Sequence, residues 1–154
     1  MANQDPQPEQ YEVVAVFDST ASGDSILTNI NTFQANNEIV RIYGMRINIT
    51  DNAATPANLN PQTTDNCDFT VTITSGSANV PSNGFRMRPT WVSNTRQINF
   101  ASPILVMFKS PFQVTITANQ AIGAGANGRI VTLELMSEIG IQKVVLQKTR
   151  LNKY

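Results

Sequence analysis

Histidine is absent from this chain of 154 residues. It is the commonest general base near neutral pH and the commonest metal ligand, so its absence excludes Ser-His-Asp triads, Cys-His pairs and His-ligated zinc sites within the chain. Cys67 is the only cysteine, which also excludes an internal disulfide and a thiolate zinc cluster. No run of about 18 apolar residues occurs, so no membrane-spanning helix is expected. We predict no enzyme activity, no cofactor and no metal site.

Charged residues are also scarce, at 14% against roughly 25% in an ordinary soluble domain. The net charge is zero, but residues 1–68 carry −7 and residues 69–154 carry +7. Such segregation fits complementary faces between identical subunits, or a basic end that meets an anionic surface. The more ordinary explanation is that the two halves interleave in the fold, so that their opposite charges cancel locally. The basic C-terminal residues are too sparse to predict nucleic acid as a specific partner.

The residues that are abundant favour β-structure. Thr, Ile and Val number 16, 14 and 12, whereas Leu numbers only 7. Branching at Cβ restricts a side chain in a helix and suits a pleated surface. We predict an all-β, single-domain β-sandwich over residues 11–148, with a flexible N-terminal arm at 1–10 and a basic tail at 149–154. Its expected strands are residues 11–18, 25–30, 38–49, 67–75, 85–92, 96–100, 104–109, 112–118, 130–138 and 141–148, the last two forming a hairpin around Gly140.

Alternation assigns faces to several of these strands. Residues 67–75 and 112–118 alternate apolar and polar side chains, which is typical of strands with one buried face. We expect Cys67 to lie on such a buried face. The 38–49 strand is expected to carry five apolar side chains on one face, with Gly44 as a candidate β-bulge: Ile39, Tyr43, Met45, Ile47 and Ile49.

Residues 123–128 match the G-x-G-x-x-G spacing of dinucleotide-binding loops. That loop binds a pyrophosphate because a helix N-terminus follows it. Here β-branched, alternating residues follow, so we predict a turn between two strands and no nucleotide site.

The most informative segment is a run of five apolar residues that alternation does not explain: Ile104, Leu105, Val106, Met107 and Phe108. A strand of this kind is expected to be covered on both faces, one by the sandwich core and the other by a loop, a neighbouring subunit or lipid. We predict an oligomer interface here. Arg86 and Arg88, beside Trp91, are an interface rim, a recognition rim or an exposed strand face.

Four of the expected strands carry a resemblance at the level of architecture: EIVRIYGMRINI, CDFTVTITS, PFQVTITA and RIVTLELMSE. Together with the terminal arm and the long polar loops, they resemble the single jelly-roll virion proteins of tailless icosahedral viruses and phages. This resemblance implies an eight-stranded jelly roll. The expected arm departs from the arginine-rich arms of genome-packing coats because it carries Asp5 and Glu9. It therefore resembles a minor capsid, penton (vertex) or decoration protein more closely.

Three functions remain open at this stage. The first is a structural virion protein, made in the host cytoplasm because no signal peptide is recognisable, that forms a homo-oligomer (pentamer or trimer) and contacts a major shell protein. The second is a carbohydrate- or receptor-binding module whose rim includes Trp91 and the loops at 50–66 and 119–128. The third is an enzyme that uses carboxylates alone. We expect the first.

Overall fold

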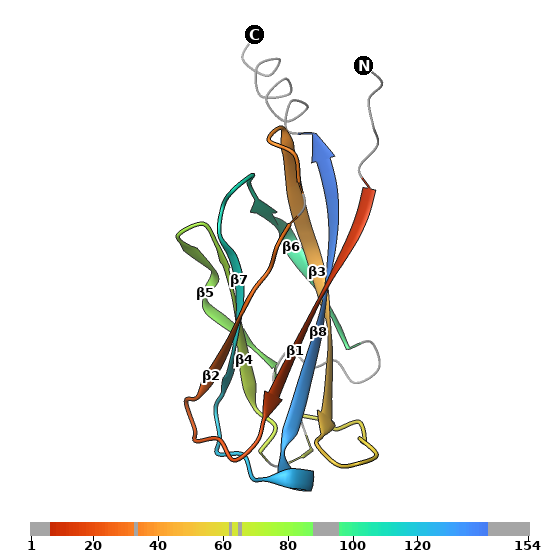
Figure 1. The fold of residues 1–154 in the computed structure, drawn as a ribbon, viewed down its shortest axis with the longest axis vertical. Coiled ribbons are helices and arrows are strands. Elements are labelled where there is room, and N and C mark those ends of the chain that lie inside the picture. The colour runs from red at the N-terminus through yellow and green to blue at the C-terminus, as the bar shows by residue number, and fades with distance from the viewer. Residues whose placement is uncertain (1–6, 33, 62, 65, 88–95, 142–154) are drawn as a thin grey trace.

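The computed structural model describes residues 7–32, 34–61, 63–64, 66–87 and 96–141. A 3-10 turn at Gly125–Asn127 precedes the last strand. No helix in this part of the chain is long and apolar enough to cross a membrane. The strands, labelled in Figure 1, are β1 (Gln7–Phe17), β2 (Ser25–Asn29), β3 (Glu38–Asp51), β4 (Phe69–Ser75), β5 (Ala78–Arg86), β6 (Gln97–Val106), β7 (Phe112–Ala118) and β8 (Arg129–Ile141).

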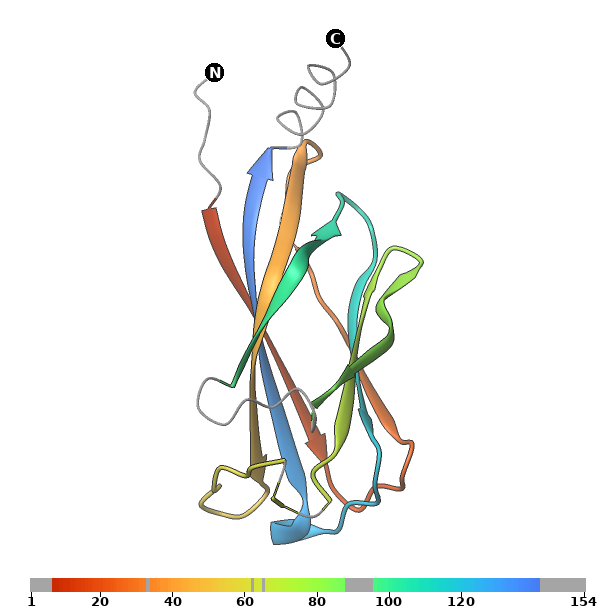
Figure 2. The same ribbon diagram turned by 180° about the vertical axis from the view of Figure 1, so that it is seen from behind.

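The strands form two four-stranded sheets that face each other, as Figures 1 and 2 show from opposite sides. One sheet has the order β1-β8-β3-β6 and the other β2-β7-β4-β5, and all neighbouring strands are antiparallel. Consecutive strands alternate between the sheets from β1 to β4 and from β6 to β8. This is the strand order of an eight-stranded jelly roll. The expected all-β sandwich is confirmed.

The core lies between the sheets. Phe17 on β1 and Phe69 on β4 are fully buried, with ring centroids 5.1 Å apart, and so join the two layers. Every second residue is buried from Phe69 to Ile73 in β4 and throughout β7, as their alternation predicted. Cys67 is also fully buried, as expected. The sandwich therefore rests on one continuous hydrophobic core.

Gly44 lies at a β-bulge, as predicted, because the register of β3 against β6 and β8 shifts between Ile42 and Gly44. The extra residue reverses the alternation on its N-terminal side. Val40 and Ile42 therefore face the core, while Tyr43 is exposed. The expectation that Tyr43 shares a face with Met45, Ile47 and Ile49 was wrong for this reason.

Several strand boundaries differ from the expected ones. β1 begins at Gln7, so the last four residues of the expected arm pair with β8. β6 is continuous through Pro103, which is tolerated because β6 is an edge strand and because Pro103 lies between Asn99 and Ile104, where the register with β3 shifts and no residue of β6 has a β3 partner. β8 continues through Gly140, which pairs with Ile39, so the expected hairpin does not begin there. β5, Ala78–Arg86, includes the first two residues of the strand expected at 85–92, and residues 88–95 and 142–154 fall outside the described part.

The two oppositely charged halves of the chain interleave in the fold. Strands from the first half pair with strands from the second, as in β1 with β8 and β3 with β6. Both ion pairs observed among the described residues join the halves, Arg46 with Glu134 and Arg86 with Asp68. The segregation seen in the sequence is therefore partly cancelled by local pairing.

Candidate functional site

The segment of residues 104–108 divides between the two faces of β6 and the turn that follows. Ile104 and Val106 are buried in the core, whereas Leu105 on the opposite face is 46% exposed. Met107 and Phe108 follow the end of the strand and are exposed as well. Among the described residues, the second face of this segment is thus left uncovered. We call its exposed side chains, Leu105, Met107 and Phe108, the β6 patch.

A turn holds the end of the β6 patch in place. The Ser110 amide donates to the Met107 carbonyl at 3.0 Å. The Nζ of Lys109 lies 5.3 Å from the centroid of the Phe108 ring, within cation–π range. Phe108 also borders a hollow of about 400 Å³ between this turn and residues 29–32. The patch therefore combines exposed apolar side chains with a concave neighbouring surface.

Arg86 is the one member of the expected rim that the structure describes. Its side chain is largely exposed, and its guanidinium donates to both oxygens of the buried Asp68 carboxylate, the shortest N–O distance being 2.5 Å. This hydrogen bonding, followed by the charge of Asp68, raises the pKa of Arg86 above its ordinary value. Arg86 thus compensates a buried charge just before the start of β4. Arg88 and Trp91 lie outside the described residues.

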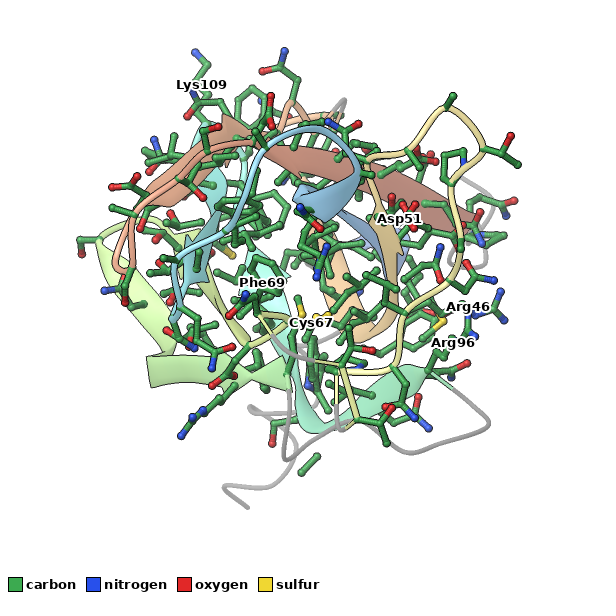
Figure 3. The ribbon with its side chains drawn as sticks, turned by 90° about the horizontal axis from the view of Figure 1, so that it is seen from below. Arg46, Asp51, Cys67, Phe69, Arg96 and Lys109 are labelled. Carbon is green, nitrogen blue, oxygen red and sulfur yellow. The ribbon has the colours of Figure 1, made fainter. Side chains whose placement is uncertain are left out.

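A polar hollow of about 420 Å³ opens on the outer face of the β1-β8-β3-β6 sheet. Figure 3 labels Arg46 and Arg96 close together at the periphery, far from Phe69 in the core. The loop after β3 turns back so that Asn58 bridges to Thr50, which brings Asn58 to the hollow. The side chains that line it come from β3, that loop, the start of β6 and β8: Arg46, Ile47, Asn48, Asn58, Arg96, Thr132 and Glu134.

The two arginines of this hollow make different contacts. Arg46 lies 4.0 Å from Glu134 and 3.4 Å from the amide oxygen of Gln97. Arg96 donates to the Asn48 side-chain oxygen at 2.8 Å, and its carbonyl accepts from the Ile47 amide at 2.8 Å. The φ of Arg96 is 48°, in the left-handed region that non-glycine residues rarely adopt. Backbone and side-chain contacts thus hold Arg96 in a strained conformation at the rim of the hollow.

Sequence reasoning missed this hollow. Its residues are separated by as many as 88 positions, from Arg46 to Glu134. Only the register of β3 against β8, in which Arg46 lies opposite Glu134, brings them together. The alternation of the polar Arg46 and Asn48 with apolar residues along β3 was the one signal available.

A second exposed apolar group was missed on β1. Val14 and Val16 point to the outer face of their sheet and are 50% and 48% exposed. The signal was present, since residues 13–16 read Val-Val-Ala-Val and cannot all face the core.

Residues 123–128 form the predicted turn between β7 and β8, with the 3-10 turn inside it. The Gly125 amide donates to the Asp18 carboxylate at 2.9 Å, so a carboxylate of the chain already occupies this backbone donor. Among the described residues, no group of three His, Cys, Asp or Glu side chains is placed to hold a metal ion.

Comparison with known proteins identifies no family. No protein-family model matches the chain, and no curated protein matches it. Among solved structures it is similar to a chain from Bacillus endospore appendages, described as a novel family of disulfide-linked pili. The match covers 92% of this chain and 94% of that chain, at 13% identity and a TM-score of 0.28. A similarity at this level carries no argument about function.

Proposed function

We propose that this protein is a structural virion protein, a minor capsid, penton or decoration subunit that assembles with itself and contacts a larger shell. The jelly-roll strand order supports this proposal, because viral capsid proteins use that architecture. Lectin domains and cupins use it too, so the support must also come from the surface of the molecule.

The observation that carries the proposal is the β6 patch. Leu105, Met107 and Phe108 are large apolar side chains that remain exposed beside a hollow. Burial of such side chains in the core of an interface is the usual source of affinity between subunits. The subunits would form a closed ring, a pentamer or trimer, because a heterologous contact closes by rotation. The segregated charges outside the two ion pairs would orient neighbouring subunits.

The proposal also states where the protein is found and which other surface it contacts. The subunit is made in the host cytoplasm and is found in the virion. Its C-terminal residues 149–154 contain Arg150 and Lys153 without an acidic residue, which suits contact with an anionic surface.

Light scattering on a size-exclusion column tests the proposal, with the full chain and a variant that lacks residues 2–6. The deletion stops at residue 6 because β1 begins at Gln7. We expect a discrete pentamer or trimer from the full chain. Assembly should be lost in Phe108→Asp and retained in the matched control Leu27→Asp, whose leucine is 54% exposed on β2. The proposal would be contradicted if the chain is a monomer at high concentration, both alone and when mixed with the major shell protein.

The polar hollow favours a second function, a carbohydrate- or receptor-binding module. Guanidinium, amide and hydroxyl groups converge in it from Arg46, Asn48, Asn58 and Thr132. Such groups recognise ring hydroxyls and carboxylates of sugars by directional hydrogen bonds. A glycan array distinguishes this function: Arg46→Ala should abolish a signal from the hollow, and Trp91→Ala should abolish one from the expected rim. An array without signal for the unaltered chain excludes both.

A further inference from the structure

The four edge strands of the sandwich differ in how well they resist pairing with another chain. The edges are β1 and β6 in one sheet and β2 and β5 in the other. β5 contains Pro81 and β6 contains Pro103, and proline lacks the N–H that a new ladder requires. β2 is only five residues long. These are the features by which natural proteins block edge pairing.

β1 lacks these features over most of its length. It is eleven residues long, and its one proline, Pro8, lies near its N-terminal end, so residues 9–17 contain none. At about 3.4 Å per residue, this stretch offers an edge roughly 30 Å long. Within the described part of the chain, every backbone hydrogen bond of residues 9–17 is made to β8. An edge strand in that position presents a row of N–H and C=O groups away from its neighbour.

The side chains of β1 add an apolar contact to this open edge. Val14 and Val16 lie next to each other on the outer face, and each is about half exposed. Their neighbours on β8 are Thr132 and Ile130, so a mainly uncharged strip runs across the end of the sheet. Another strand placed along β1 would cover both valines.

We propose that β1 pairs antiparallel with β1 of a second copy of this chain, around a two-fold axis at Val14. In this register Val14 lies opposite Val14 of the copy, Glu12 opposite Val16, and Gln10 opposite Asp18. No carboxylate faces a carboxylate. A parallel, in-register pairing would instead place Glu9 beside Glu9 and Glu12 beside Glu12, and like charges in that position are destabilising.

The contact is isologous, since the same strand is used by both copies. It joins two four-stranded sheets into one continuous sheet and leaves the β6 patch at the far edge. The inference rests on the proposed self-assembly and adds to it, because a two-fold contact cannot build a pentamer or trimer. It links neighbouring rings.

Disulfide trapping tests the contact in the full chain. Val14→Cys is made together with Cys67→Ala, which removes the native thiol. Paired residues at the axis have Cα atoms about 4.5–5.5 Å apart, inside the range that a disulfide bridges. Oxidation should yield a covalent dimer. The matched control is Leu27→Cys in the same background, which is equally exposed but lies on β2.

A second variant keeps the test independent of the Cys67 background. Val14→Lys, with native Cys67, places two ammonium groups opposite each other at the axis. We expect the concentration for half-association of rings to rise by roughly tenfold or more, with the ring itself retained. Leu27→Lys should leave it unchanged. Circular dichroism and thermal unfolding establish that both variants are folded.

The outcomes separate this contact from the proposed function. A dimer trapped by Val14→Cys and not by Leu27→Cys supports the contact. If neither cysteine traps a dimer, or both do equally, and Val14→Lys associates normally, the contact is wrong. Rings that still depend on Phe108 would then leave the proposed assembly standing.

Discussion

Leu105 and Val106 are consecutive residues of β6 that face opposite sides of the sheet, so the same substitution should act on them very differently. Val106 is fully buried and Leu105 is nearly half exposed. Val106→Asp loses about 1.5–3 kcal/mol of apolar burial. It also places a carboxyl group in the core without a hydrogen-bonding partner, which costs about 2–7 kcal/mol of stability. The combined loss is comparable to the 5–15 kcal/mol that stabilises an ordinary domain.

Leu105→Asp is expected to reduce the free energy of unfolding by about 1 kcal/mol or less. Arg41 lies opposite residue 105 in the β3–β6 register. A cross-strand pair of opposite charges contributes about 0.2–1 kcal/mol, which offsets part of the lost contact. The same variant should lose assembly, because a charge replaces an apolar side chain of the β6 patch.

Urea unfolding followed by circular dichroism measures the stability of both variants, at a protein concentration low enough that the unaltered chain is dissociated too, and light scattering measures their assembly at a higher concentration. We expect Val106→Asp to be largely unfolded in the absence of urea. Leu105→Asp should keep a urea midpoint close to that of the unaltered chain. In light scattering it should have a smaller molar mass than the unaltered chain. Leu105→Asn is the uncharged control. The reasoning is refuted if the two aspartate variants unfold at similar urea concentrations.

Two further predictions concern the bulge and the pH dependence of stability. Gly44→Ala should destabilise the fold by about 1–3 kcal/mol, because the new Cβ lies 2.7 Å from the Ile98 carbonyl oxygen and 2.7 Å from the Met136 methyl group. Urea unfolding measures this, and the loss caused by Gly44→Ala should be smaller, but not absent, in a Met136→Ala background, since the carbonyl cannot withdraw. The pKa of Tyr11 is raised above its ordinary value of 10.0, first by burial and then by the charge of Glu9. The unfolded chain therefore ionises first, so the contribution of Tyr11 to stability is present below about pH 10 and lost above it. Tyr11→Phe should flatten the decline in the urea midpoint across that pH, and an unchanged decline would contradict the assignment.

Local patterns determined the fold class, and for a physical reason. Side chains alternate across a strand with a period of two, so apolar residues at every second position must share a face whatever the strand pairs with. The 112–118 strand was predicted with its bounds and its buried face for this reason. The bulge at Gly44 was also predicted, because glycine within a strong β pattern marks a register change.

Boundaries that depend on a neighbouring strand could not be read from the sequence. Gly140 and Pro103 both look like strand ends, since glycine weakens a strand and proline removes a donor. Gly140 stays in β8 because β3 pairs with it, and Pro103 stays in β6 because it lies in a register shift on an edge strand, where no β3 residue pairs with it. Tyr43 was assigned to the wrong face because a bulge shifts the alternation in a direction that only the pairing reveals.

The sequence by itself determined that this chain is a β-sandwich without histidine chemistry, because composition and alternation are properties of each strand alone. Which strands lie at the edges, which valines stay exposed and which charged residues meet were decided by the tertiary structure. Arg46 and Glu134 come together only through the register of β3 and β8. The order of antiparallel strands depends on contacts between residues far apart in the chain, and no local pattern records them.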